Sequence, residues 1–262
     1  MRNIVLACMT VLTLYGCSPT GEMIEEVTSA SENTRELDNG TYTNWSRQSA
    51  LEGASELTLT GVFSKKADSY DWYVKMLMTG EGEEISELVT ELLQKEGIAK
   101  QRLHFTGENE DAEWFVLPES QLQEPTNLFV KQEMLPQAKY VETATETEEG
   151  NLRHYTFTMK DSYGDKVRDD AVAAAQVALA EARENKELIQ TISVLEQNVT
   201  RNEAISYTNI ALAFTVDEEG ILTSYETLMD VHLENGTPVR TENGTSIADY
   251  NLVDVESAFP TP

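Results

Sequence analysis

The most regular pattern in this chain lies in residues 205–233, which read ISYTNIALAFTVDEEGILTSYETLMDVHL. Apolar side chains recur at every second position from Ile210 to Val216, and apolar residues resume at Ile221 after the turn-forming run Asp217–Gly220. Alternation of this kind is typical of antiparallel strands with one apolar face, joined by a short turn. These residues therefore predict a β-hairpin that buries one of its faces.

The same alternation predicts strands elsewhere along the chain. It is clearest in residues 71–79, where Trp72 and every second residue to Met78 share one side. The loop 64–70 connects this strand to a predicted strand over 57–63 in an antiparallel hairpin. Further strands are predicted over 103–105, 114–117, 153–160 and 241–255.

Helical spacing predicts segments that interrupt the strands. Residues 83–96 carry apolar side chains at i, i+3, i+4, i+7 and i+8 from Ile85, and Gly97 follows as a stop signal. Residues 165–198 carry a stripe of small apolar residues, with a predicted kink at Asn185. Residues 45–54 predict a short entry helix.

Long alternating strands joined by short turns predict an antiparallel sheet with one apolar face, which the amphipathic helices must cover. The predicted fold class is α+β: a curved antiparallel β-sheet, forming an incomplete barrel, packed against helices. The sequence has no internal period of 20–50 residues, which argues against a solenoid or a propeller.

The N-terminus predicts export and a lipid anchor. Arg2 precedes an apolar run of about eleven residues, which is too short for a bilayer core that needs roughly 20. The sequence Leu14-Tyr15-Gly16-Cys17 then resembles the lipobox of bacterial lipoproteins. The resemblance implies a signal peptide over 1–16, acylation of Cys17, and attachment through an N-terminal diacylglyceryl cysteine to the extracytoplasmic face of the bacterial cell membrane.

The residues after the lipobox are polar, with Met23, Ile24 and Val27 as the main apolar exceptions. We therefore predict a lipidated N-terminus and flexible polar tether over 17–43, and a folded domain over 44–262. Cys8 leaves with the signal peptide, so the mature chain has no second cysteine for an intramolecular disulfide. The domain must be stabilised by its core.

The composition argues against several classes of function. There are 19 Lys and Arg against 46 Asp and Glu, giving a formal net charge of −27 that repels nucleic-acid phosphates. The chain lacks the Gly-X-Ser-X-Gly, His-Glu-X-X-His, phosphate-loop and paired-cysteine motifs. Its acidic runs lack the ligand order of a calcium loop, so we interpret them as solvated turns. We expect no enzyme activity, metal, cofactor or nucleic-acid partner. The runs are Glu81–Glu84, Glu108–Glu113, Glu142–Glu149 and Asp217–Glu219.

A known group of proteins is similar to this chain in its order of elements. That order runs from the lipobox through hairpins and helical segments to a final meander, which contains Tyr250-Asn251, Val255 and Phe259-Pro260. These are uncharacterised Gram-positive lipoproteins related to the LolA/LppX-like superfamily. The resemblance covers most of residues 45–260 as a pattern of elements. It implies an incomplete β-barrel closed by helices around an apolar cavity, and the binding of lipids or acyl chains.

Methionine and aromatic side chains on the predicted strand faces are the candidate ligand-binding residues. Methionine is flexible and polarisable, so a wall of such side chains can adapt to an acyl chain. The same residues also fit an ordinary core packed against helices, and the alternative function is a non-enzymatic cell-surface scaffold that binds another envelope protein. The candidates are Trp72, Met76, Met78, Phe115, Tyr155, Phe157, Met159, Phe214, Tyr225 and Met229.

Overall fold

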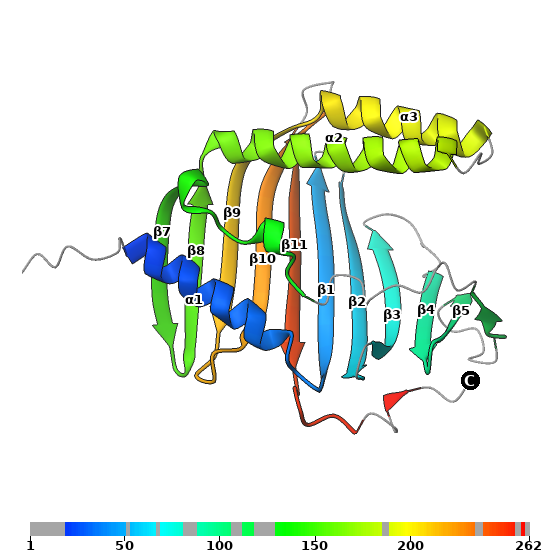
Figure 1. Ribbon diagram of the computed structural model, residues 1–262, viewed down its shortest axis with the longest axis horizontal. Coiled ribbons are helices and arrows are strands. Elements are labelled where there is room, and N and C mark those ends of the chain that lie inside the picture. The colour runs from blue at the N-terminus through cyan, green and yellow to red at the C-terminus, as the bar shows by residue number, and fades with distance from the viewer. Residues whose placement is uncertain are drawn as a thin grey trace, which may run out of the picture.

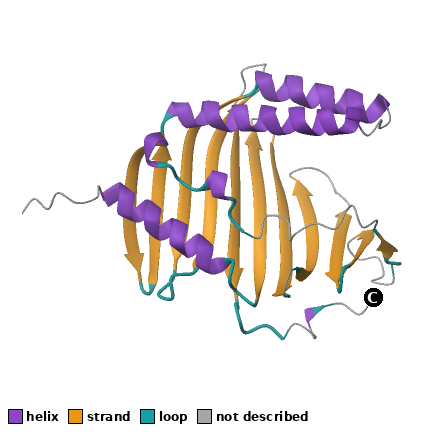
Figure 2. Ribbon diagram, in the orientation of Figure 1, coloured by secondary structure: helices purple, strands orange, loops and turns teal. Residues whose placement is uncertain are grey.

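The computed structural model describes residues 19–50, 53–66, 69–80, 88–105, 112–117, 129–184, 189–233, 238–254 and 258–259. They form one open, curved antiparallel sheet of eleven strands with helices packed against it (Figures 1 and 2). The prediction of an α+β fold built on a curved antiparallel sheet with helices is confirmed.

The strand order across the sheet is β6-β5-β4-β3-β2-β1-β11-β10-β9-β8-β7. The strands are β1 (Asn39–Ala50), β2 (Gly53–Lys65), β3 (Tyr70–Gly80), β4 (Leu88–Lys95), β5 (Ile98–Phe105), β6 (Phe115–Val116), β7 (Val141–Glu149), β8 (Leu152–Met159), β9 (Ser206–Val216), β10 (Leu222–His232) and β11 (Pro238–Ala248). The helices are α1 (Pro19–Thr34), α2 (Asp161–Glu184) and α3 (Ile189–Ala204), with short 3-10 turns η2 (Gln132–Met134) and η3 (Ala138–Tyr140).

Two meanders, β1–β6 and β7–β11, meet where β1 pairs with β11. The antiparallel register runs from Thr41 opposite Ala248 to Ser49 opposite Arg240. The two strands that join the sheet therefore come from opposite ends of the described chain.

One face of the sheet, which we call the inner face, packs against α1. Its residues share parity across neighbouring strands: Tyr155 lies opposite Phe214, Phe214 opposite Tyr225, and Tyr225 opposite Thr245. Further along, Tyr42 lies opposite Ile247 on the same face. Because side chains alternate across a strand, the remaining residues of each strand lie on the other, outer face.

A bulge in β9 keeps the inner face apolar up to the start of that strand. Leu228 lies opposite Ala211, but Asp230 lies opposite Thr208, so β9 contains one extra residue there. Asn209 has a φ of 51° at this point, a conformation that asparagine tolerates better than most residues. The shift leaves Tyr207 opposite Val231, on the inner face with Ile210.

Helix α1 crosses the inner face of β7–β10 diagonally, and the paired helices α2 and α3 lie along one end of the sheet (Figure 1). Val27 and Ala30 of α1 are fully buried against the inner face. An ion pair of 2.6 Å between Arg183 and Glu196 links α2 to α3. No helix in the described ranges combines the length and apolar character needed to cross a membrane.

The predicted tether over 17–43 is wrong for the described residues, because residues 19–34 form α1 and β1 begins at Asn39. The folded unit therefore includes α1 and does not begin at residue 44. The helix presents one apolar side to the sheet, because its apolar residues recur every three or four positions. They are Met23, Ile24, Val27 and Ala30. Composition missed this helix because its stability comes from packing on the sheet rather than from its own apolar content.

Three other predictions of local structure are wrong. Residues 45–50 belong to strand β1, not to a short entry helix. Residues 88–95 form strand β4, where the sequence predicted the second part of a helix over 83–96. Residues 83–87 of that predicted helix lie outside the described part. In β4, Val89 and Leu93 are buried on the outer face, so spacing that fits a helix also fits a strand with apolar residues on both faces. The acidic run 142–149 is strand β7 rather than a turn, at a sheet edge where charged side chains oppose pairing with other chains.

The other strand predictions are confirmed, with β2, β3, β8, β9, β10 and β11 near their predicted positions and β5 paired with β6. The long helical region is also confirmed as α2 and α3, while the predicted kink at Asn185 lies outside the described residues.

The substitution Gly164→Ala tests the packing of α2 on β9. In an ordinary helix alanine is more stable than glycine by about 0.5–1 kcal/mol. A Cβ at residue 164 would overlap the backbone carbonyl of Tyr207, so we expect the substitution to lower the free energy of unfolding by about 1–3 kcal/mol in urea titrations. Ser162→Ala, at an exposed position of the same helix, should change it by less than about 0.5 kcal/mol. A more stable Gly164→Ala chain would contradict this packing.

Candidate functional site

The structure gathers six of the ten predicted binding residues beneath α1. Five of them are at most 8% exposed and belong to one apolar cluster with Val27 and Ala30 of α1. Met229 is partly buried and packs against the same cluster. While α1 is docked, these five side chains form packed core rather than an open wall. They are Tyr155, Phe157, Met159, Phe214 and Tyr225.

The other four predicted residues lie apart from that cluster. Trp72 is buried in a second inner-face cluster with Phe63, Val74 and Ile247, and Met76, four residues further along β3, is half-buried. The Met78 side chain lies outside the described part. Phe115 is 62% exposed on β6, at the edge of the sheet.

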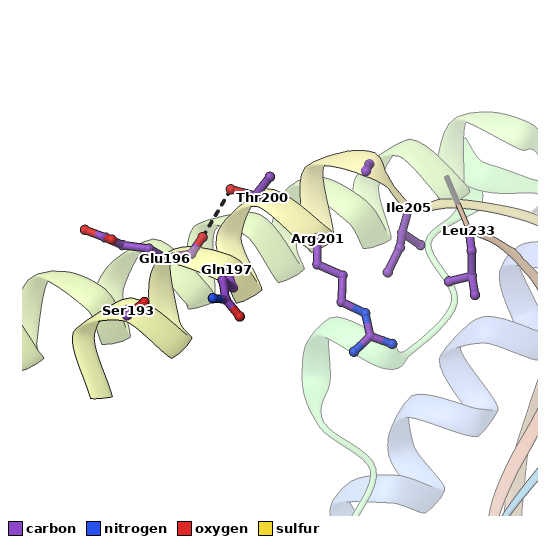
Figure 3. A pocket seen from close by; sticks show the side chains of 8 residues that line it. Ser193, Glu196, Gln197, Thr200, Arg201, Ile205 and Leu233 are labelled. Carbon is purple, nitrogen blue, oxygen red and sulfur yellow. Dashed lines mark hydrogen bonds between the residues drawn. The ribbon is translucent and has the colours of Figure 1, made fainter. Parts of the chain in front are cut away.

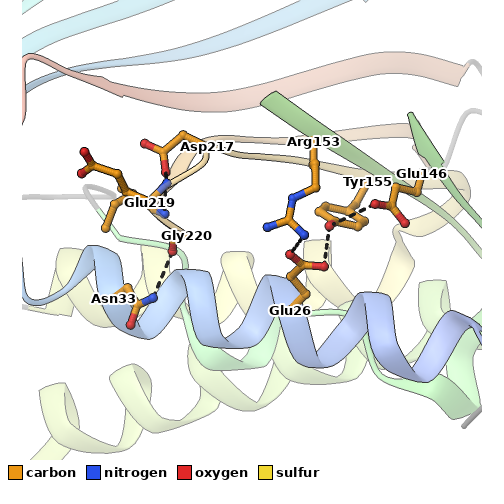
Figure 4. A network of polar contacts seen from close by, with 9 residues as sticks. Glu26, Asn33, Glu146, Arg153, Tyr155, Asp217, Glu219 and Gly220 are labelled. Carbon is orange, nitrogen blue, oxygen red and sulfur yellow. Dashed lines mark hydrogen bonds and ion pairs between the residues drawn. The ribbon is translucent and has the colours of Figure 1, made fainter. Parts of the chain in front are cut away.

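Polar contacts hold α1 to β8 at the centre of the helix (Figure 4). Glu26 forms an ion pair with Arg153 and accepts a hydrogen bond of 2.6 Å from the Tyr155 hydroxyl. Burial raises the pKa of Tyr155 above its ordinary value, so its hydroxyl stays a donor at neutral pH. A carboxylate on the buried side of α1 is therefore paired, as burial of charge requires.

A second set of contacts holds the C-terminal end of α1 to the β9–β10 turn. The Asn33 amide donates to the Gly220 carbonyl at 3.1 Å (Figure 4). The buried Thr34 hydroxyl donates to the Ala30 carbonyl at 2.7 Å and accepts from the Leu222 amide at 2.9 Å. The Thr34 hydroxyl thus gives the buried Leu222 amide a hydrogen-bond partner, as buried polar groups require.

The turn that receives α1 is itself rigid. The Asp217 carboxylate accepts hydrogen bonds from the backbone amides of Glu219 and Ile221 at 3.0 and 2.8 Å. It also accepts a hydrogen bond from the Tyr250 hydroxyl, and this bond raises the pKa of Tyr250 to about 12. Asp217, predicted to be part of a solvated acidic turn, is 7% exposed and organises the turn.

A pocket of about 530 Å³ lies between α3 and the adjoining ends of β9 and β10 (Figure 3). Its volume is within the range of small-molecule sites. Polar side chains of α3 line one part, and Ala204, Ile205 and Leu233 supply an apolar part. The α3 residues that line it are Ser193, Glu196, Gln197, Thr200 and Arg201.

This pocket continues the inner face. Tyr225, Met229 and Val231 share one face of β10, and Val231 lies opposite Tyr207 of β9. Leu233 continues the same alternation into the pocket. This row of β10, which is apolar except for the buried Thr227 between Tyr225 and Met229, therefore leads from the core beneath α1 to the pocket beneath α3.

The predicted candidates did not include the pocket residues of α3. Ser193, Gln197 and Arg201 are four residues apart and so share one helix face, but nothing in the sequence showed what that face would lie against. The available signal was Arg201 itself, one of only 19 cationic residues in a chain with 46 acidic ones.

The outer face carries a polar cluster around Glu91. Glu91 pairs with Arg102 and accepts a hydrogen bond of 2.6 Å from Tyr73, while Arg102 stacks on Trp114 at 4.8 Å. Burial raises the pKa of Glu91, but these two donors outweigh it and hold the pKa below its ordinary value. The Glu91 carboxylate is thus paired with donors from its own cluster.

Chemical groups for metal binding are not gathered in the described residues, where no three His, Cys, Asp or Glu side chains lie close enough to hold an ion. The three histidines are separate: His104 lies 3.7 Å from Glu91, His154 contacts the Thr215 hydroxyl at 3.1 Å, and His232 contacts the Thr208 hydroxyl at 2.8 Å.

Comparisons with known proteins add little. No family model and no curated protein matches the chain. Among solved structures, the bifunctional dehydratase-cyclase domain in ambruticin biosynthesis is 9% identical, with 91% of this chain and 84% of that chain covered and a TM-score of 0.16. The dehydratase domain from the terminal module of the rifamycin polyketide synthase is 12% identical, with 88% and 82% covered and a TM-score of 0.14. Likeness at this level carries no argument about fold or function.

A pair of threonine substitutions tests how α1 is held. Thr28 and Thr34 both donate to the carbonyl four residues earlier at 2.7 Å, but Thr34 also accepts the Leu222 amide. Thr34→Val keeps the side-chain shape and leaves that buried amide without its acceptor, so we expect it to cost about 1–3 kcal/mol more unfolding free energy than Thr28→Val. Amide hydrogen exchange at Leu222 should accelerate in Thr34→Val only. Equal effects of the two substitutions would contradict the role of Thr34.

Proposed function

We propose that this protein is a membrane-anchored extracytoplasmic lipoprotein whose sheet, acting as a half-barrel, binds a hydrophobic ligand such as a lipid or an acyl chain. The observation that carries the proposal is the mainly apolar row of β10, interrupted by Thr227, which leads from the core at Tyr225 to the pocket at Leu233 just after the strand ends. The resemblance to the LolA/LppX-like superfamily supports it. The proposed role is binding, and no step of catalysis is part of it.

The two ends of this row would serve different purposes. Residues beneath α1 are packed, so they can touch a ligand only if α1 shifts. Met229 and Leu233, which are half-buried, lie where the cover of α1 gives way to the pocket of α3. We therefore assign direct contact with the ligand to the Met229 end of the row, and support of the sheet to the Phe157 and Phe214 end.

The proposed lipid anchor would hold the domain close to the membrane. Only Ser18 separates Cys17 from the first residue of α1, and two chain steps span at most about 7 Å. The N-terminal end of α1 lies by β7, at one edge of the sheet (Figure 1). Acyl chains on Cys17 would therefore place the β7 edge next to the bilayer, and two or three chains make such an anchor stable.

A second candidate function is an interaction scaffold for another envelope protein. The observation that favours it is a group of exposed apolar side chains on β5 and β6 at the sheet edge, with Leu103, Phe105 and Phe115 on the inner face and Ile98 and Val116 on the outer face. A partner that covered this edge would bury side chains that are now 44–68% exposed. They are Ile98, Leu103, Phe105, Phe115 and Val116.

Native mass spectrometry tests ligand binding. The full chain with Cys17→Ser, purified without detergent from bacteria, should carry an added mass that extracts into organic solvent. Met229→Gln should weaken binding by about 1–2 kcal/mol, a factor of about 5–30, because it places an amide against an apolar ligand. Leu228→Gln is the matched control, since the neighbouring side chain lies on the outer face. A bare polypeptide mass, even after incubation with lipids, would contradict the proposal and favour the scaffold.

Metabolic labelling with an alkyne analogue of palmitate tests the anchor independently. The wild-type chain and Cys8→Ser should incorporate the label into the membrane fraction, whereas Cys17→Ser should not. Retention of the label in Cys17→Ser would show that acylation, if any, occurs elsewhere.

A further inference from the structure

We propose that the pocket beneath α3 binds the anionic headgroup of an amphiphile and that Arg201 selects for its negative charge. This inference rests on the proposed function, because it assumes that an apolar tail lies along the inner face. It adds the class of ligand: a molecule with a single acyl or alkyl tail and a carboxylate or phosphate head.

Arg201 has an available positive charge. Of the arginines in the described ranges, six form ion pairs with carboxylates and Arg35 donates to the Val130 carbonyl at 2.7 Å. Arg201 is the one in these ranges with neither an ion pair nor a hydrogen bond from its side chain. In a chain with a net charge of −27, an exposed guanidinium at the wall of a pocket, with no carboxylate partner among the described residues, is a suitable partner for an anionic ligand.

The neighbours of Arg201 fit the same interpretation. Gln197 and Ser193 lie about one and two helical turns before it, respectively, on the same side of α3 (Figure 3), and both can donate hydrogen bonds to oxygen atoms. Among the described residues that line the pocket, Glu196 is the one acidic side chain, and its carboxylate is held by Arg183 of α2 at 2.6 Å. Its negative charge is thereby balanced, which reduces its repulsion of an anion.

The apolar side of the pocket gives the tail its direction. Ile205 is 9% exposed and lies next to Leu233 at the pocket wall. Burial raises the pKa of Tyr207, and the positive charge of Arg201 acts in the opposite direction. Arg201 therefore lies close enough to Tyr207 for its charge to be felt at the Tyr207 hydroxyl. Tyr207 and Val231 form an inner-face pair, so the charged head and the apolar row meet within a few residues.

Three ligands with the same tail test the proposal on the full chain carrying Cys17→Ser: dodecanoate, dodecyl phosphate and dodecan-1-ol. Affinities are measured by isothermal titration calorimetry below the micelle concentration. We expect at least one anion to bind at least about tenfold more tightly than the alcohol. Arg201→Gln should remove that preference and leave the affinity for the alcohol unchanged, while Arg201→Lys should retain part of it. The stronger of the two anions distinguishes a fatty carboxylate from a lipid phosphate.

Arg240→Gln is the control for net charge, because it removes one positive charge from an exposed position on the outer face of β11. It should leave all three affinities unchanged. A wild-type chain that binds the alcohol as tightly as the anions, or an Arg201→Gln chain that keeps the preference, would overturn the role of Arg201 while the proposed function stands. If none of the three ligands binds the wild-type chain, both the proposed function and this inference fail.

Discussion

Pairing of β1 with β11 is the interaction on which the rest of the structure depends. It joins strands about 200 residues apart in sequence and converts two meanders into one sheet. The buried Asn44 amide donates to the Thr245 hydroxyl at 2.7 Å within this ladder, and the Trp45 ring lies where any Cβ at Gly244 would stand. Without the ladder the inner face would end at β11 on one side and at β1 on the other, and both meanders would expose an edge strand with unpaired backbone N–H and C=O groups.

A sheet of this width has an apolar face larger than one helix can cover, and the helices meet the sheet in two different places. Helix α1 is packed directly on β7–β10, with Val27 and Ala30 fully buried. Helices α2 and α3 are joined to the sheet through α2 on β9, which leaves a pocket beneath α3. The same strand, β10, therefore contributes to packed core at Tyr225 and to a pocket wall at Leu233. Whether a side chain of β10 is packed core or borders a pocket depends on the helix that lies above it.

Much of the sheet could be predicted because its strands alternate clearly. Phe157 and Phe214 lie on one parity of β8 and β9, and both are buried as that pattern requires. Strand β1 could not be predicted, because its inner-face Asn44 is polar and satisfied by a residue 201 positions away. Helix α1 was hidden for a similar reason: Glu26, Ser31 and Thr34 face the sheet, and their partners Arg153 and Leu222 come from distant strands. Six predicted site residues were brought together, but beneath α1 rather than in the pocket.

The sequence by itself determined the α+β class, most of the strands, the long helical region, the acidic surface and the set of apolar side chains that share the inner face. These are consequences of local spacing, because the side-chain period of a strand or helix assigns each residue to a face. Tertiary structure alone decided that β1 pairs with β11, that residues 19–34 dock as a helix, and that Arg201 borders a pocket. Those features arise from contacts between residues far apart in the chain. Which group pairs with a buried polar side chain, and which element packs over an apolar one, is decided only when the sheet assembles.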